Sequence, residues 1–250
     1  MKKVAEITLI FWIMKICATT LGETAGDMLS MTFNIGYGLS SVILLSFFVI
    51  TLIAQLFSKK YHPVLYWSII LTTSTAGTTI SDYMDRTLGF GYAKGSMLLI
   101  FMLISILVLW YKIEKSLSVE NISSFRPETF YWFTILISNT LGTALGDYLA
   151  DDSGLGFGGG ALLIGSSILG VVLLHFYTKI SKVILFWIAF VLTRPFGATF
   201  GDLLTKPTEK GGFNIGTIGS SSVLFTILIL LVIYSIFIEK RKTHQVDKNV

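Results

Sequence analysis

The chain has 250 residues, of which 53% are hydrophobic and only 14% are charged, and its mean hydropathy is +0.74. Too little polar surface remains to cover a water-soluble domain, so the composition excludes that class and predicts an integral membrane protein. The formal net charge of +4 comes from the flanks of the apolar segments. It therefore indicates contact with lipid headgroups, and we expect no nucleic-acid partner.

Eight continuous apolar segments follow one another along the chain. They cover residues 5–27, 39–57, 64–83, 95–113, 129–149, 161–178, 183–203 and 217–238. Each is close to the ~20 residues that an α-helix needs to cross a bilayer, and continuous runs favour helices over the strands of a β-barrel. We expect an all-α, polytopic bundle of eight transmembrane helices in a single integral membrane domain over 1–250, with residues 239–250 as a cytoplasmic tail.

The motif Gly-x-x-x-[Gly/Ser]-Asp ends the first, third, fifth and seventh segments. Its copies are formed by Gly22, Gly26 and Asp27; Gly77, Ser81 and Asp82; Gly142, Gly146 and Asp147; and Gly197, Gly201 and Asp202. A tryptophan stands 15 residues before each aspartate, namely Trp12, Trp67, Trp132 and Trp187. The aspartates are 55, 65 and 55 residues apart. This spacing predicts two successive duplications and four repeats, at about 5–57, 64–113, 129–178 and 183–238.

Each repeat contains two crossings, so every copy enters the membrane from the same side. The repeats are therefore expected to be parallel and related by an axis along the membrane normal, with pseudo-fourfold or nested twofold symmetry. Glycines four residues apart clear a flat patch on which another helix can approach closely. We expect the motif glycines to pack helices.

Basic residues indicate the orientation of the bundle. Thirteen lie at the termini or between repeats, and four lie in the connections within repeats. The first group comprises Lys2, Lys3, Lys59, Lys60, Lys112, Lys115, Arg126, Lys179, Lys182, Lys240, Arg241, Lys242 and Lys248, and the second comprises Arg86, Lys94, Lys206 and Lys210. Because cytoplasmic loops carry the excess of Lys and Arg, we expect both termini to be cytoplasmic and the motif loops to face outward.

Polar residues continue inward from the aspartates on one helix face, since residues four apart stack on each other. The row four before the aspartates holds Glu23, Thr78, Thr143 and Ala198; the row eight before holds Thr19, Ser74, Asn139 and Arg194; and the row twelve before holds Lys15, Ile70, Ile135 and Phe190. Such a stripe is expected to point into the bundle. Counting ~1.5 Å per residue places the aspartates at the outer margin, in a partly hydrated vestibule, and Lys15 and Arg194 near mid-depth.

The repeats differ at positions that carry charge. Repeat 1 alone has Lys15 and Glu23 on the stripe, and repeat 4 alone has Arg194 followed by Pro195. Repeats 1 and 4 are neighbours in a closed ring, so Glu23 or Asp27 is a candidate partner for Arg194, which would lower the cost of burying each charge. A glycine-rich cluster follows each aspartate, and it fits either a tight outer hairpin or a re-entrant segment that lines a cavity.

No catalytic constellation is visible in the sequence. Cys17 is the only cysteine, so neither an intrachain disulfide nor a zinc cluster is available. The three histidines lie near the cytoplasmic helix ends, away from the carboxylates. We therefore expect a protein that is not an enzyme and has no cofactor.

The four tandem units, each with two helices, a tryptophan and a Gly-x-x-x-Gly-Asp-like ending, resemble a bacterial family of membrane proteins built from domain-of-unknown-function 347 repeats. The resemblance covers residues 5–238, and repeat 2 departs from it with Ser81 in place of the second glycine. It implies this architecture and a location in the bacterial cytoplasmic (inner) membrane. It implies no activity.

Two functions fit these residues. The first is a small transporter or channel in which Asp27, Asp82, Asp147, Asp202 and Glu23 attract a cation at the outer mouth. Coupling to protons, through protonation of one carboxylate, fits the same residues. Lys15, Arg194 and Asn139 then form an internal counter-charge or gate, which would equally suit a small organic anion. The second is a non-transporting scaffold or sensor in the lipid bilayer, whose aspartates accept hydrogen bonds from their own loops.

Overall fold

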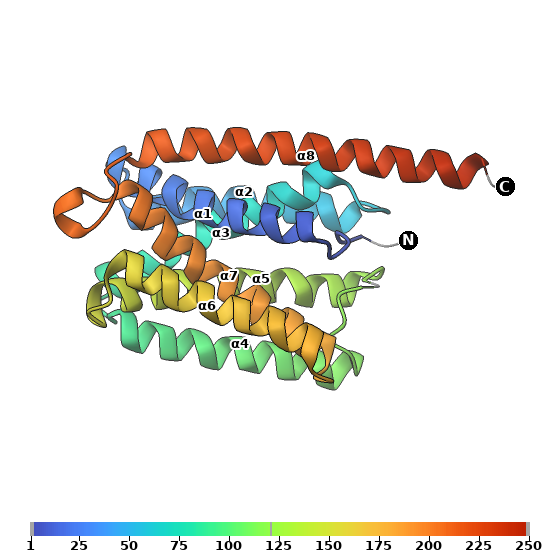
Figure 1. Cartoon of the computed structure of the whole chain (residues 1–250), viewed down its shortest axis with the longest axis horizontal. Coiled ribbons are helices and arrows are strands. Elements are labelled where there is room, and N and C mark those ends of the chain that lie inside the picture. The colour runs from blue at the N-terminus through green and yellow to red at the C-terminus, as the bar shows by residue number, and fades with distance from the viewer. Residues whose placement is uncertain (1–2, 121, 249–250) are drawn as a thin grey trace.

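A computed structural model describes residues 3–120 and 122–248, with side chains up to Arg241; Lys2 lies outside the described residues. Eight α-helices occur in this part of the chain, close to the predicted segments. They are α1 (Leu9–Asp27), α2 (Tyr37–Phe57), α3 (Pro63–Asp82), α4 (Tyr92–Glu114), α5 (Phe125–Asp147), α6 (Gly156–Tyr177), α7 (Lys182–Thr205) and α8 (Thr217–Lys248). Both termini lie at one end of the bundle and the connections within repeats lie at the other (Figure 1). The all-α prediction is confirmed.

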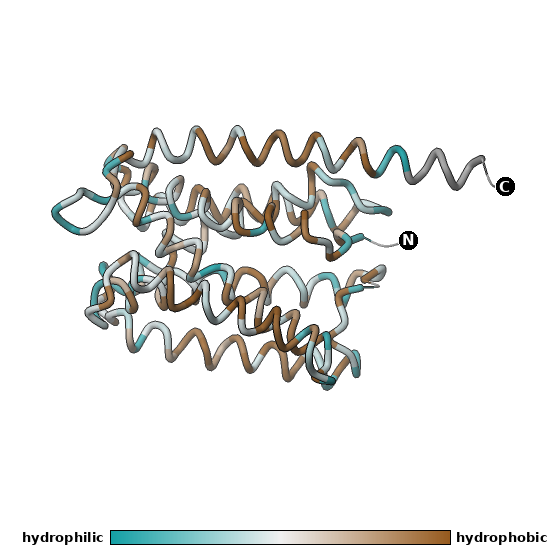
Figure 2. The backbone as a smooth tube through the Cα atoms, viewed as in Figure 1, coloured by the Kyte–Doolittle hydropathy of each residue, from teal (hydrophilic) through white to brown (hydrophobic). Residues whose placement is uncertain are grey.

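Five of these helices, α2, α4, α6, α7 and α8, are long and apolar enough to cross a membrane among the described residues. The chain is therefore a multi-pass membrane protein. Helices α1, α3 and α5 are not among the helices apolar enough to cross a membrane. Polar residues of the stripe occupy their buried faces. Hydrophilic residues gather in the loops at both ends of the bundle (Figure 2).

The odd-numbered helices form an inner ring. Helix α1 packs against α3, α3 against α5, α5 against α7, and α7 against α1. Each even-numbered helix packs outside the ring on the inner helix of the next repeat, so α2 covers α3, α4 covers α5, α6 covers α7, and α8 covers α1. The ring closes with the same contact four times, which gives the pseudo-fourfold arrangement that the spacing of the repeats predicts.

The motif glycines lie where neighbouring inner helices come closest. The first glycine of each motif faces the row that lies eight residues before the aspartate of the next repeat: Gly22 faces Ser74, Gly77 faces Asn139, Gly142 faces Arg194 and Gly197 faces Thr19. The second glycines face the row four before: Gly26 faces Thr78, Gly146 faces Ala198 and Gly201 faces Glu23. A Cβ atom at any of these sites would meet the neighbouring helix.

Aromatic side chains fill the axis toward the termini. The hydroxyls of Tyr66 and Tyr131 hydrogen-bond to each other at 2.6 Å, and both rings pack on Trp132. Three of the motif tryptophans, Trp67, Trp132 and Trp187, are buried in the same cluster, and Trp12 is half-buried at its edge. This half of the bundle is closed by packing.

A buried network holds the N-terminal segment across the same end. Lys3 Nζ lies 2.7 Å from Glu128 Oε2 and donates to the carbonyl of Leu56. The Gln55 amide donates to the other oxygen of Glu128 and to the carbonyl of Lys3. The Lys3 backbone N–H donates to the carbonyl of Ile122. The segment thereby joins α2, α5 and the α4–α5 connection.

The connections within repeats are hairpins. In the first three repeats the inner helix continues into one π-helical turn: η1 (Met28–Thr32), η2 (Tyr83–Thr87) and η3 (Tyr148–Asp152). A few residues then lead into the outer helix, and Gly36 (φ +81°) and Gly91 (φ +72°) take left-handed conformations directly before α2 and α4. In repeat 4 the connection contains the 3₁₀ turn η4 (Thr208–Lys210). The hairpin alternative therefore describes these connections, and not the re-entrant one.

Candidate functional site

The four motif aspartates lie at the C-terminal ends of the inner helices, and each is 1–3% exposed. Burial at this level differs from the hydrated vestibule that the sequence predicts. The reason is that two basic side chains from the hairpin end cover the carboxylates. Asp82 and Asp202 each form an ion pair with a basic residue of the connection that follows them, and Asp147 and Asp27 each form one with a basic residue of another repeat.

Arg86 joins two aspartates of neighbouring repeats. Its Nε lies 2.9 Å from Asp82 Oδ1, and its Nη2 donates to Asp147 Oδ2 at 3.1 Å. Burial disfavours the guanidinium charge, but the carboxylates of Asp82 and Asp147 outweigh it and hold the pKa of Arg86 above its ordinary value. The side chain therefore stays charged and neutralises part of this pair.

Lys206 plays the same part in the other half of the ring. Its Nζ lies 2.7 Å from Asp27 Oδ2 and 3.0 Å from Asp202 Oδ1. Burial opposes this charge as well, and the carboxylates of Asp202 and Asp27 raise the pKa of Lys206 above its ordinary value. The aspartates thus form two cation-bridged pairs and not one ring.

The spacing of Arg86 and Lys206 in the sequence is a signal for these bridges, although both residues lie in connections between helices. Arg86 and Lys206 each follow their own aspartate by four residues, and they are 120 residues apart. A spacing of four places both groups on one helix face. Repeats 1 and 3 have Met31 and Asp151 at this position. The basic residue therefore occurs in every second repeat, which is a twofold pattern within the fourfold fold.

Deeper in the ring, Arg194 of α7, eight residues before Asp202, is bound to Glu23 of α1, four residues before Asp27. Arg194 Nη1 donates to Glu23 Oε2 at 3.0 Å, and both side chains are almost fully buried. Nη2 donates to the hydroxyls of Thr78 and Thr143 at 2.5 and 2.7 Å and to the carbonyl of Ser74. Of the two candidate partners in the sequence, Glu23 is the one that pairs with Arg194.

Lys15 lies one row below Arg194, and Asn139 lies in the same row as Arg194. Lys15 Nζ donates to Asn139 Oδ1 at 3.3 Å and lies 4.1 Å from the centre of the Phe190 ring. Asn139 Nδ2 donates to Thr73 Oγ1 at 3.0 Å. The polar stripe therefore runs continuously from the aspartates to Lys15, and the aromatic cluster ends it.

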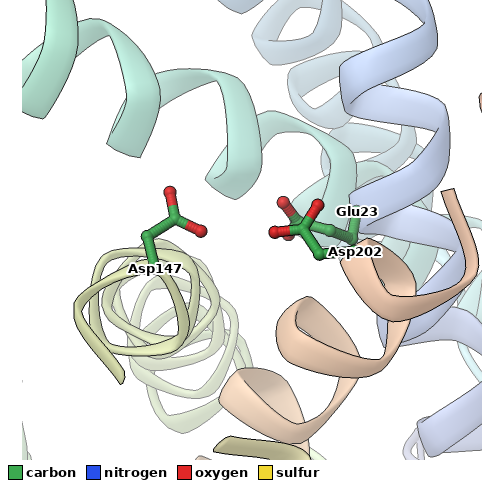
Figure 3. A group of neighbouring side chains, drawn as sticks. All are labelled: Glu23, Asp147 and Asp202. Carbon is green, nitrogen blue, oxygen red and sulfur yellow. The ribbon is translucent and has the colours of Figure 1, made fainter. Parts of the chain in front are cut away.

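Three buried carboxylates from different inner helices lie close together. One oxygen each from Glu23, Asp147 and Asp202 lies within 4.8 Å of the other two, and all three residues are buried. The carboxylates come from α1, α5 and α7 and point toward one another (Figure 3). Carboxylate oxygens are the donors that hard cations prefer, and carboxylates held this close together also favour proton uptake.

Charge on the axis is not balanced. Five carboxylates (Glu23, Asp27, Asp82, Asp147 and Asp202) stand against four basic groups (Lys15, Arg86, Arg194 and Lys206). If every one of these groups carried its ordinary charge, one negative charge would be in excess, and in a low-dielectric interior such a charge favours binding of a proton or a cation. The converging carboxylates are the natural location for it.

A comparison with family models matches the chain four times, at residues 10–61, 65–116, 130–181 and 185–241, to the Repeat of Unknown Function (DUF347). The chain belongs to the DUF347 family. Each DUF347 match contains one inner and one outer helix of the ring, which confirms both the resemblance and the four repeats. No curated protein and no solved structure matches the chain. The family description names no activity, so the function must be argued from the site.

Proposed function

We propose that this DUF347 protein binds a small cation and moves it across the membrane. The observation that carries the proposal is the convergence of the buried carboxylates of Glu23, Asp147 and Asp202, contributed by three different inner helices. In this account α1, α3 and α5 also cross the bilayer, sheltered from lipid by the apolar outer helices. That arrangement makes eight transmembrane helices around a polar axis.

The proposed orientation follows the distribution of basic residues. The termini and the aromatic cluster lie on the cytoplasmic side of a bacterial inner membrane, and the hairpins face outward. A cation then arrives from outside through the tier of Arg86 and Lys206, which must move for the ion to pass. Nothing in this function requires a cofactor or catalysis.

A non-transporting scaffold is the second candidate. It is favoured by the two cation-bridged pairs, because Arg86 and Lys206 tie all four aspartates across repeat boundaries. A scaffold needs these bridges for stability and needs no ion. The two functions therefore differ in whether the central carboxylates bind an ion in the folded protein.

Cation binding to the purified protein distinguishes them. We expect isothermal titration in detergent to show one site for Mn²⁺ or Na⁺, and Asp147→Asn to weaken that site at least about tenfold, which corresponds to ~1.4 kcal/mol. The matched control is Asp152→Asn, which removes the same charge from an exposed position of η3. We expect it to bind like the wild type.

Two results would exclude the proposed site. One is the absence of binding for both Mn²⁺ and Na⁺ by the wild-type protein. The other is equal binding by the Asp147→Asn and Asp152→Asn variants. Circular dichroism and thermal melting of each variant show whether a loss of binding reflects a loss of fold.

A further inference from the structure

Lys15 lies beneath the carboxylates, in the same row as the apolar residues Ile70, Ile135 and Phe190, which we call the apolar floor. All four residues are 0% exposed. A charged group at such a depth is costly and marks a functional position unless it is paired. Among the described residues, no carboxylate forms a salt bridge with Lys15, whereas Arg194 one turn above has Glu23.

The surroundings of Lys15 accommodate both the charged and the neutral amine. The Thr73 hydroxyl donates to the carbonyls of Ile69 and Ile70, so it accepts from Asn139 Nδ2 and directs Asn139 Oδ1 toward Lys15. An amide oxygen accepts a hydrogen bond from either form. The Phe190 ring favours the ammonium through its π face, and the apolar floor favours the neutral amine.

The other groups around Lys15 do not neutralise it. Arg194 faces it from α7 and repels its charge. On α3 and α5 the nearest titratable groups toward the termini are Tyr66 and Tyr131, which hydrogen-bond to each other. Helix α8 packs on α1 and has no charged residue before Glu239. The charge of Lys15 is thus balanced only by the carboxylates above it.

We propose that Lys15 exchanges its proton against the cation, and this inference rests on the proposed function. When the ion enters among Glu23, Asp147 and Asp202, the ammonium of Lys15 gives one proton to water and becomes a neutral amine. When the ion leaves, the amine takes one proton back. For a monovalent ion the charge on the axis is the same before and after the exchange.

The size of this coupling follows from distance. Glu23 and Lys15 are eight residues apart on α1, which is ~12 Å along the helix. At an effective dielectric constant of ~20, repulsion over this distance changes an equilibrium constant on the order of tenfold for a monovalent ion and a hundredfold for a divalent one. Coupling is reciprocal, so the protonation state of Lys15 changes the affinity for the ion by the same factor.

The experiment compares binding of Mn²⁺ and Na⁺ to the wild type, Lys15→Met and Lys15→Arg between pH 6 and pH 9. We expect wild-type affinity to rise with pH, by up to about a hundredfold for Mn²⁺ and tenfold for Na⁺. Lys15→Met is expected to have the high affinity throughout this range, and Lys15→Arg the low affinity. Titration in two buffers of different ionisation enthalpy should show proton release by the wild type and its loss in both variants.

The outcomes separate this inference from the proposed function. If the wild type binds the ion but Lys15→Met shows the same pH dependence and the same proton release, Lys15 is not the exchanging group. If the wild type binds neither ion, the proposed function itself fails. If Lys15→Arg does not fold, Lys15→Met alone decides, because a structural role would not change proton release.

Discussion

Replacing Arg194 with methionine is expected to lower the free energy of unfolding by about 3–5 kcal/mol. The change leaves Glu23 as an unpaired buried carboxylate and removes the donor shared by Thr78, Thr143 and the Ser74 carbonyl. Unfolding in mixed micelles with increasing SDS measures the loss. The control is Arg126→Met, which removes an exposed arginine and is expected to change stability by no more than ~0.5 kcal/mol.

The double variant Glu23→Gln with Arg194→Met isolates the interaction. Since neither member then leaves the other charge unpaired, we expect the double variant to be more stable than the sum of the two single losses predicts. Additive losses would show that the two side chains do not interact in the folded protein. A loss for Arg194→Met no larger than that for Arg126→Met would contradict the structure at this site.

The second large effect is expected at Gly77. A Cβ there would lie 2.9 Å from the backbone C atom of Asn139 and the backbone N atom of Thr140, neither of which can rotate away. Gly77→Ala must push α3 away from α5, which we expect to cost about 1–3 kcal/mol. The same SDS titration measures it.

Gly170→Ala is the matched control for Gly77. Gly170 lies within α6 and has open space around the position of a Cβ, so alanine is expected to stabilise the helix by up to ~1 kcal/mol. If both substitutions shift the unfolding midpoint in the same direction and by the same amount, close packing of the inner ring is not what Gly77 provides.

Much of the fold follows from the sequence because the repeat encodes it in register. The spacing of Trp67 and Asp82 recurs with the same interval in every unit, and equal units that enter from the same side can close into a ring. The rows of residues four apart also place Glu23 and Arg194 at neighbouring levels of that ring. Periodic information of this kind is sufficient to predict helices, their order and the direction of the polar stripe.

The arrangement of charges does not follow as directly. Arg86 and Lys206 lie beyond the apolar segments, in positions typical of ordinary loop residues. The sequence therefore predicts aspartates that are exposed to water. Only the π-helical continuation of α3, and the chain directly after α7, bring these cations back over the carboxylates. Lys3 and Glu128 form a buried pair across 125 residues, and no periodicity connects them.

Cation flux into proteoliposomes tests whether this protein moves a cation across the membrane. We expect vesicles containing the wild type or Asp152→Asn to take up radioactive manganese or sodium faster than empty vesicles, and vesicles containing folded Asp147→Asn to lose that uptake. Uptake by Asp147→Asn at the wild-type rate, or wild-type vesicles that take up neither ion faster than empty ones, would contradict a cation path through Glu23, Asp147 and Asp202.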